Sequence, residues 1–183
     1  TSSIMGLFIT KWEISGGYIQ WEKGLQEIRS GQVWRIFTPM FIHFGIMHIV
    51  FNMLWLRDLG SMIEAREGSW RLLLLVLLTA AGSNLAQYLI SIPSLPTMSG
   101  GRPNFGGMSG VVYGLLGYMW MRGKLDPASG LFLHKSTVTM MLIWLVVCFT
   151  GLLGPIANLA HLFGLLIGMG AGFFFTRFRF SKF

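Results

Sequence analysis

Long apolar stretches, separated by short polar turns, dominate this chain. Crossing the hydrocarbon core of a bilayer takes about 20 apolar residues in a helix. Inside lipid every backbone N–H and C=O group must be bonded within the chain, so such stretches are expected to be helices rather than isolated strands. The stretches that are long enough, or nearly so, are 41–62, 70–90, 108–121, 136–150 and 157–175.

Composition also places these stretches in lipid. Of the residues, 53% are hydrophobic and only 11% are charged, whereas a soluble domain has about 25% charged residues. A soluble fold of this size could not cover its surface with so few charges. We therefore expect an all-α polytopic membrane protein.

The distribution of basic residues predicts the orientation. We interpret the net charge of +7 as a topology signal and as contacts with anionic lipid headgroups, not as a nucleic-acid surface. The loops 91–107 and 151–156 carry only Arg102. The basic residues expected on the opposite side are Arg57, Arg66, Arg71, Arg122, Lys124, Lys135, Arg177, Arg179 and Lys182. Because positively charged loops stay inside, we expect a cytoplasmic carboxyl terminus.

Two apolar segments are too short for a full span. Residues 4–9 make only about two helical turns, so they are either the tail of a helix or a segment lying flat at the interface. Residues 108–121 supply only about 14 apolar residues, which is about 21 Å of helix. One end of that helix should therefore lie below the membrane surface.

Residues 11–37 have the composition of an interfacial segment. They mix charges of both signs with Trp12, Trp21 and Trp34, and tryptophan is enriched at membrane–water interfaces. We expect residues 1–183 to form a single membrane domain. Its parts are a remnant of a first helix (1–10), an outer interfacial loop (11–37), five transmembrane helices (38–178) and a cytoplasmic tail (179–183).

Polar residues inside apolar spans are costly in lipid, so each is a candidate for function. They are His43, His48, Asn52, Ser109, Tyr113 and His161. Ser109 follows Gly107-Met108 and precedes Gly110, a G-x-S-G pattern that is weak by itself because such residues also pack membrane helices. Its position strengthens the signal. Ser109 begins the short span, where the amino end of a helix offers unpaired N–H groups to an oxyanion.

A serine nucleophile needs a base, and His161 is the candidate. It lies near the outer end of the last span, where Gly164 and later glycines allow close approach of another helix. Gly110 and the glycines after it line a comparable face of the serine helix. Tyr113 shares a face with Ser109 four residues earlier and could orient the imidazole. No carboxylate lies near the outer ends of the spans, so we expect a Ser-His dyad rather than a triad.

His48 and Asn52 lie four residues apart and share a helix face, an arrangement suited to an oxyanion hole. His43 is about 140° away from His48 around the helix, which favours a structural or water-holding role. A metal pair on a helix needs histidines four residues apart, and thiol or acidic partners are lacking here. No metal site is predicted.

Together these motifs resemble the rhomboid intramembrane serine proteases, and in particular the bacterial GlpG subgroup through GMSGVVYGLLGY at 107–118. The motifs that carry the resemblance, in chain order, are His43-x4-His48-x3-Asn52, Gly107-Met108-Ser109-Gly110 and Ala160-His161-Leu162-Phe163-Gly164. Trp34-Arg35 and Glu64-x-Arg66 match further motifs of the family. The resemblance covers about residues 33–172.

The resemblance implies a rhomboid-like bundle of six transmembrane helices, with the first apparently truncated here and a short central helix starting at the catalytic serine. Ser109 would be the nucleophile, and His161 the general base and then the general acid. His48, Asn52 and the backbone N–H of Ser109 would stabilise the oxyanion. Tyr113 would stack on His161.

Supporting roles, substrates and location follow from the same resemblance. Gly107, His43 and Gly164 would support the site, and Trp34 and Arg35 would stabilise the outer loop. Substrates would be transmembrane segments of other membrane proteins, cleaved near the outer surface after entering past residues 136–156. Membrane lipids would be the other partners, no cofactor is implied, and the membrane would be the bacterial inner membrane.

Two other classes of function stay open. A catalytically inactive relative would bind membrane clients without cleaving them; such proteins usually lack the serine or the histidine, and both are present here. A channel or transporter would use the polar residues as a path, but the chain lacks paired repeats. The sequence does not predict the oligomeric state.

Overall fold

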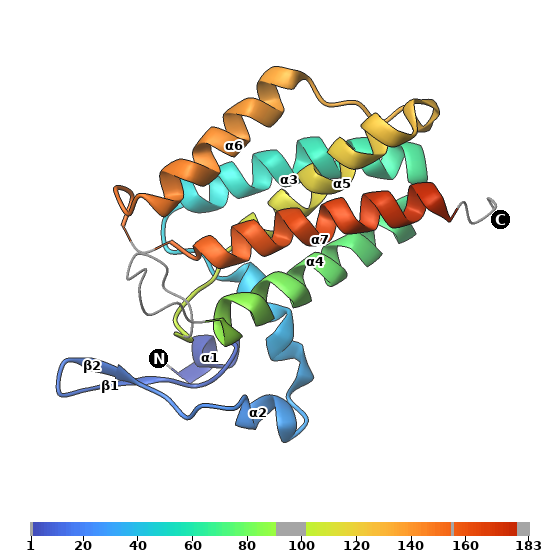
Figure 1. Cartoon of the computed structure of the whole chain (residues 1–183). Helices are drawn as coiled ribbons and strands as arrows, with labels where there is room; N and C mark the ends of the chain where they lie inside the picture. The colour runs from blue at the N-terminus through green and yellow to red at the C-terminus, as the bar shows by residue number, and fades with distance from the viewer. Residues whose placement is uncertain (1, 91–101, 155, 179–183) are drawn as a thin grey trace.

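A computed structural model describes residues 2–90, 102–154 and 156–178. The long helices lie side by side in one bundle (Figure 1). They are α3 (Ile46–Glu67), α4 (Ser69–Leu89), α5 (Ser109–Leu125), α6 (Lys135–Phe149) and α7 (Asn158–Arg177). Shorter elements gather at one end: α1 (Ser2–Met5), β1 (Glu13–Ser15), β2 (Tyr18–Gln20), α2 (Gln26–Arg29), η1 (Val33–Ile36) and η2 (Thr38–Phe41). The 3-10 helix η3 (Pro127–Ser129) follows α5. Residues 91–101 of the loop 91–107, and the predicted tail 179–183, lie outside the described residues.

The fold is mostly helical, as the sequence predicts. Each predicted span matches one long helix, and the largest shift in position is at α3. Because Pro39 lies in a 3-10 helix and Gly45 is extended, α3 begins only at Ile46. Among the described residues, α4 and α7 are long and apolar enough to cross a membrane, each with a mean hydropathy of 1.7. The presence of six transmembrane helices stays a prediction.

A short hairpin corrects the prediction of an all-α chain. β1 and β2 pair in antiparallel fashion, with Ile14 opposite Ile19. Gly16 and Gly17 form the turn with φ values of 59° and 81°. Two successive left-handed residues make the tight turn whose twist matches that of a hairpin. The Gly-Gly pair between short segments was therefore a usable signal for strands.

The apolar stretch 4–9 is not one continuous helix. α1 ends at Met5, and the chain then bends. Phe8 and Ile9 are buried, and so is Thr10. This segment therefore packs under the outer elements instead of continuing as a helix.

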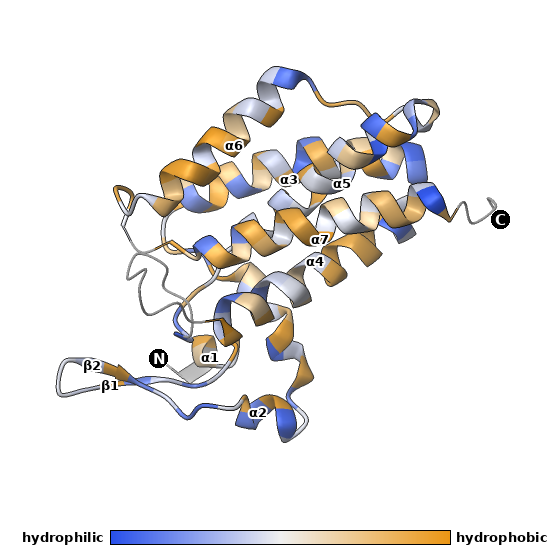
Figure 2. Ribbon diagram, viewed as in Figure 1, coloured by the Kyte–Doolittle hydropathy of each residue, from blue (hydrophilic) through white to orange (hydrophobic). Residues whose placement is uncertain are grey.

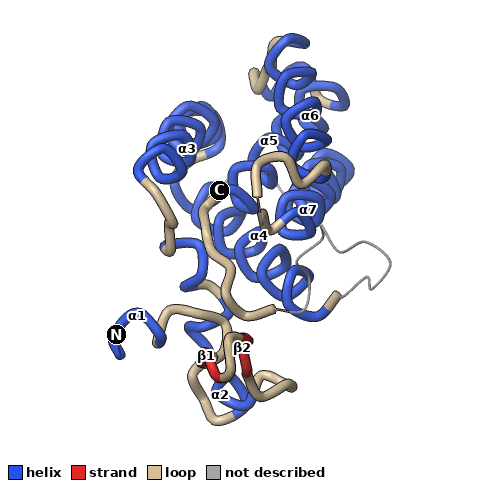
Figure 3. Tube along the Cα trace, turned by 90° about the vertical axis from the view of Figure 1, so that its left-hand side faces the viewer, coloured by secondary structure: helices blue, strands red, loops and turns tan. Residues whose placement is uncertain are grey.

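α5 is the central helix of the bundle. Seen from the end in Figure 3, it lies among α3, α4 and α7, while α6 lies to one side. Every residue from Gly110 to Met119 is buried. The helix that begins at Ser109 is therefore surrounded by protein along most of its length.

Glycines allow α5 and α7 to touch directly. A Cβ atom at Gly164 would overlap the carbonyl oxygen of Gly110, and one at Gly168 would overlap that of Gly114. Such backbone contact between small residues is a common way for membrane helices to associate. It brings the amino ends of α5 and α7 together.

A charged network joins the helices at the opposite end of the bundle. Glu67 at the end of α3 accepts hydrogen bonds from the hydroxyl of Tyr118 and from Arg122, whose Nη2 is 2.9 Å from Oε1. Arg122 Nη1 also donates to Asp126 and to Thr176, each at 3.1 Å. The network holds α5 in helical form past the end of its apolar stretch, so the helix is longer than the sequence predicts.

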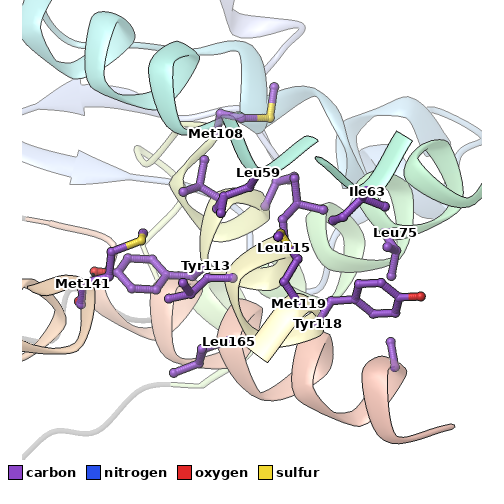
Figure 4. Close-up of a cluster of buried hydrophobic side chains, with 14 of the residues drawn as sticks. Leu59, Ile63, Leu75, Met108, Tyr113, Leu115, Tyr118, Met119, Met141 and Leu165 are labelled. Atoms are coloured by element: carbon purple, nitrogen blue, oxygen red, sulfur yellow. Dashed lines mark hydrogen bonds between the residues drawn. The ribbon is translucent and has the colours of Figure 1, made fainter. Parts of the chain in front are cut away.

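Apolar side chains fill the middle of the bundle. Leu59 and Ile63 of α3, Leu75 of α4 and Leu165 of α7 gather around Leu115 of α5 (Figure 4). Large apolar side chains are also exposed on the helices, among them Trp70 of α4, Ile143 of α6 and Phe173 of α7. Apolar residues, drawn in orange, are spread along the long helices in Figure 2. An apolar exterior as well as an apolar core suits a helical bundle whose solvent is lipid.

Arg35 and Glu27 fasten the first residues to the outer elements. Arg35, which is 2% exposed, donates from Nη1 to the carbonyl oxygens of Met5 and Phe8, both at 2.8 Å. Glu27 accepts hydrogen bonds from the hydroxyl of Thr10 and from the backbone N–H of Lys11. Burial disfavours the charged form of Glu27, but these hydrogen bonds and the charge of Arg35 hold the pKa of its carboxyl below the ordinary value.

Acid is expected to loosen this outer segment. A carboxyl whose pKa is lowered by folding stabilises the fold above its ordinary pKa, and this contribution is lost as the pH falls through the lowered pKa. Fluorescence of Trp12 and Trp21, followed from neutral to acidic pH, should report the loosening. Glu27→Gln should give the loosened signal already at neutral pH, whereas the exposed Glu22→Gln should behave like the wild type. An acid transition that persists in Glu27→Gln would contradict this account.

Gly168→Ala is expected to lower the free energy of unfolding by about 1–3 kcal/mol, because the added methyl group meets the carbonyl of Gly114. Denaturant unfolding in detergent micelles measures the change. Gly170→Ala is the matched control, since a Cβ on Gly170 of the same helix meets nothing within 4 Å. Equal stability of the two variants would rule out a tight contact between α5 and α7.

Candidate active site

Ser109 and His161 lie within hydrogen-bond distance although they are 52 residues apart. Ser109 Oγ is 2.7 Å from His161 Nε2. Each residue lies in the first turn of its helix, beside the contact between Gly110 and Gly164. A hydroxyl that is hydrogen-bonded to an imidazole nitrogen is the arrangement that activates a serine for nucleophilic attack.

Nothing in the described part of the chain hydrogen-bonds to the other imidazole nitrogen. His161 is 5% exposed, and its Nδ1 is buried without a partner there. In a Ser-His-Asp triad a carboxylate would occupy this position and orient the ring. The orientation of the imidazole must therefore come from packing and from the position of its backbone.

Tyr113 packs against the imidazole and also contacts α6. Its ring centroid is 5.0 Å from that of His161, with an angle of 32° between the planes. Its hydroxyl donates a hydrogen bond to the carbonyl oxygen of Met141 at 2.9 Å, and Figure 4 shows the two residues side by side. The side chain that the sequence places on the face of Ser109 therefore connects the imidazole to α6.

His48 approaches the serine across Gly107. A Cβ atom on Gly107 would lie 2.7 Å from His48 Nε2 and 3.6 Å from Ser109 Oγ. The φ of Gly107 is 127°, a conformation that favours glycine. The ring of His43 lies 4.9 Å from that of His48, and its Nδ1 is 3.3 Å from the carbonyl oxygen of Phe41.

Asn52 lies on α3 with His48, but no hydrogen bond joins it to the serine in the described part of the structure. It is 5% exposed, and its Nδ2 donates to the carbonyl of His48 at 2.9 Å. The amide carries a second N–H. The structure thus brings His48 beside Ser109, while Asn52 braces the turn of α3 that carries His48.

The other predicted supporting residues lie in the outer segment or in the contact between α5 and α7. Trp34 is 50% exposed on η1. Arg35 donates hydrogen bonds to the backbone carbonyl oxygens of Met5 and Phe8. Gly164 forms the backbone contact with Gly110. Their positions bear on how the site is held, not on contact with the serine.

A polar stripe on α4 was missed in the sequence. Thr79, Ser83 and Gln87 are buried and recur every four residues, so they share one face of the helix. Ser83 lies against Gly110, and Oε1 of Gln87 accepts a hydrogen bond from the backbone N–H of Ala160 at 3.0 Å. Polar residues at helical spacing inside an apolar stretch were the available signal.

Comparison with known proteins identifies relatives of this chain. The family model of the Rhomboid domain matches residues 30–178. The rhomboid protease GlpG of Salmonella paratyphi A is 41% identical over 143 residues, covering 78% of this chain and 48% of that protein. The rhomboid protease GlpG of an Enterobacter species is 41% identical over 142 residues, covering 77% of this chain and 48% of that protein. The chain spans about half the length of these curated relatives.

Tyr113→Phe is expected to loosen α6 while the aromatic ring stays on the imidazole. Loss of the hydrogen bond to Met141 should reduce the free energy of unfolding by about 1 kcal/mol. Amide hydrogen exchange should become faster in α6 and stay unchanged in α7. Tyr88→Phe is the control, because the Tyr88 hydroxyl donates to the outer segment, at 3.5 Å from the carbonyl oxygen of Glu22, and not to α6. Unchanged exchange in α6 of Tyr113→Phe would show that the hydroxyl does not hold this helix.

Proposed function

The chain belongs to the rhomboid family, and on this basis we propose that it is an intramembrane serine endopeptidase that cleaves transmembrane segments of other membrane proteins. Family membership and the apolar helices make it an integral membrane protein. The observation that carries the proposed activity is the 2.7 Å approach of Ser109 Oγ to His161 Nε2. The GlpG relatives, named as rhomboid proteases, support the same reaction class.

The reaction begins with attack by the serine. Ser109 Oγ forms a bond to the carbonyl carbon of the scissile peptide, while His161 Nε2 takes the hydroxyl proton. The carbonyl oxygen becomes an oxyanion. The backbone N–H of Ser109, which has no intrahelical acceptor at the amino end of α5, and the side chains of His48 and Asn52 stabilise this charge. His48 lies beside Gly107 and the serine, whereas the Asn52 amide donates to the carbonyl oxygen of His48, so we assign His48 the larger share.

Peptide cleavage and release follow by proton transfer. His161 gives its proton to the leaving amine as the C–N bond breaks, which leaves the acyl group on Ser109. Water then attacks the acyl carbon and gives a proton to His161. The C–O bond to the serine breaks, the proton returns to Ser109 Oγ, and the product carboxylate is released. Tyr113 holds the plane of the imidazole through both halves of the reaction.

The proposed function includes a route by which substrates enter and an orientation of the chain in the membrane. Substrate segments enter laterally past α6 and the loop that follows it, and membrane lipids are the other partners. The chain forms one rhomboid-like domain of transmembrane helices, with 11–37 as the outer loop. Trp34 and Arg35 stabilise that loop. The basic residues at one end of the spans support a cytoplasmic carboxyl terminus, and the membrane of the proposal is the bacterial inner membrane.

A serine-reactive phosphonate tests the proposed chemistry. The purified chain should be labelled at Ser109 and should cleave a test substrate that contains a transmembrane segment. Ser109→Ala should abolish both signals, and His161→Ala should lower both by about 1,000-fold or more, because nucleophile and base act as a unit.

Phe163→Ala is a control that removes a side chain near His161 but no reacting group. A folded wild-type protein that neither labels nor cleaves would contradict the protease proposal and favour a client-binding relative without activity.

A further inference from the structure

We propose that Gln87 is a positioning residue, which fixes the backbone turn that carries His161. The inference rests on the proposed function, because the position of the imidazole matters for proton transfer from Ser109. Gln87 comes from the middle of the chain and His161 from near its end. The contact between their helices is therefore a tertiary one, made by Gln87 Oε1 and the N–H of Ala160 at 3.0 Å.

The amino end of α7 needs such a partner. The first N–H groups of a helix have no acceptor within the helix, and the N-cap residue Ala157 offers no side-chain hydrogen bond. Gln87 supplies an acceptor from α4 instead. The N–H that it binds belongs to Ala160, the residue directly before His161.

Gln87 is fully buried, which makes its hydrogen bond to Ala160 important for the stability of this contact. Its side chain is 0% exposed, and a buried amide is costly unless it is hydrogen-bonded. Its Nε2 has no partner among the described residues. Within this part of the chain, the hydrogen bond to Ala160 is therefore the one that the Gln87 side chain makes. Such a residue would be readily replaced by an apolar one if it only filled space.

His161 depends on its backbone more than a triad histidine does. Its Nδ1 has no partner among the described residues, so no carboxylate there fixes the ring. The orientation rests on Tyr113 from one side and on the place of the α7 turn. A displacement of about 1 Å at a catalytic group can lower a rate by about 100-fold. Gln87 therefore acts on the reaction through the backbone of Ala160.

Gln87→Met tests the inference, since methionine has a similar length but accepts no comparable hydrogen bond. We expect kcat for the test substrate, and the rate of phosphonate labelling, to fall by about 10- to 100-fold. KM should stay within about twofold of the wild-type value, because no substrate contact is removed. Gln87→Glu keeps an oxygen facing Ala160 and should recover part of the lost rate. Amide exchange at Ala160 should accelerate selectively in Gln87→Met.

Asn84→Leu is the matched control. Asn84 is also a buried amide on α4, 4% exposed, but its Nδ2 donates to the carbonyl of Ile36 in the outer segment at 2.9 Å. This variant should loosen the outer segment and leave the labelling rate of Ser109 within about twofold of the wild-type value, because it leaves the α7 turn intact.

Several outcomes would overturn the inference. If the wild type labels and a folded Gln87→Met labels at the same rate, the inference fails and the proposed function stands. An unprotected Ala160 amide in the wild type also refutes it, even if the variant does not fold. A rate that falls while exchange at Ala160 stays slow would show that Gln87 acts by another route. A wild type that does not label contradicts the proposed function and this inference together.

Discussion

The site depends on direct contact between the backbones of α5 and α7. Gly110 follows Ser109 immediately, and Gly164 lies three residues after His161, so one of the backbone contacts between the two helices lies beside the serine and the imidazole. Lipid gives little hydrophobic drive for helices to associate, and close van der Waals packing supplies the attraction instead. Because Gly110 and Gly164 have no side chain, the two helices can come close enough for Ser109 and His161 to form a hydrogen bond.

The sequence predicts the main helices because apolar length is a local property. It also predicts the meeting of Ser109 and His161, since glycines at four-residue spacing mark the faces that approach. Tyr113 follows from the same helical periodicity. These inferences need only the spacing of residues within one helix and the chemistry of a serine that lacks a carboxylate partner.

The contacts that the sequence does not predict join residues from different helices. Nothing in the local pattern says that Gln87 faces the backbone of Ala160, or that the hydroxyl of Tyr113 reaches the carbonyl of Met141. Almost every residue type carries the same backbone N–H and C=O groups, so the residue type at a position does not reveal that its backbone binds a distant side chain. For Asn52, helical spacing gives a shared face with His48 but not the partner that its amide selects.

The charged network around Glu67 and Arg122 has a mechanical consequence. It ties α3, α5 and α7 together at the end of the bundle away from Ser109. When helices are held together at one end, a small change in the tilt of a helix at that end produces a larger displacement at its other end. α3 has 22 residues and is about 33 Å long, and a tilt of about 10° around its clamped end moves the opposite end by about 6 Å. The end of α3 that carries His48 is therefore the part that a change in tilt displaces furthest.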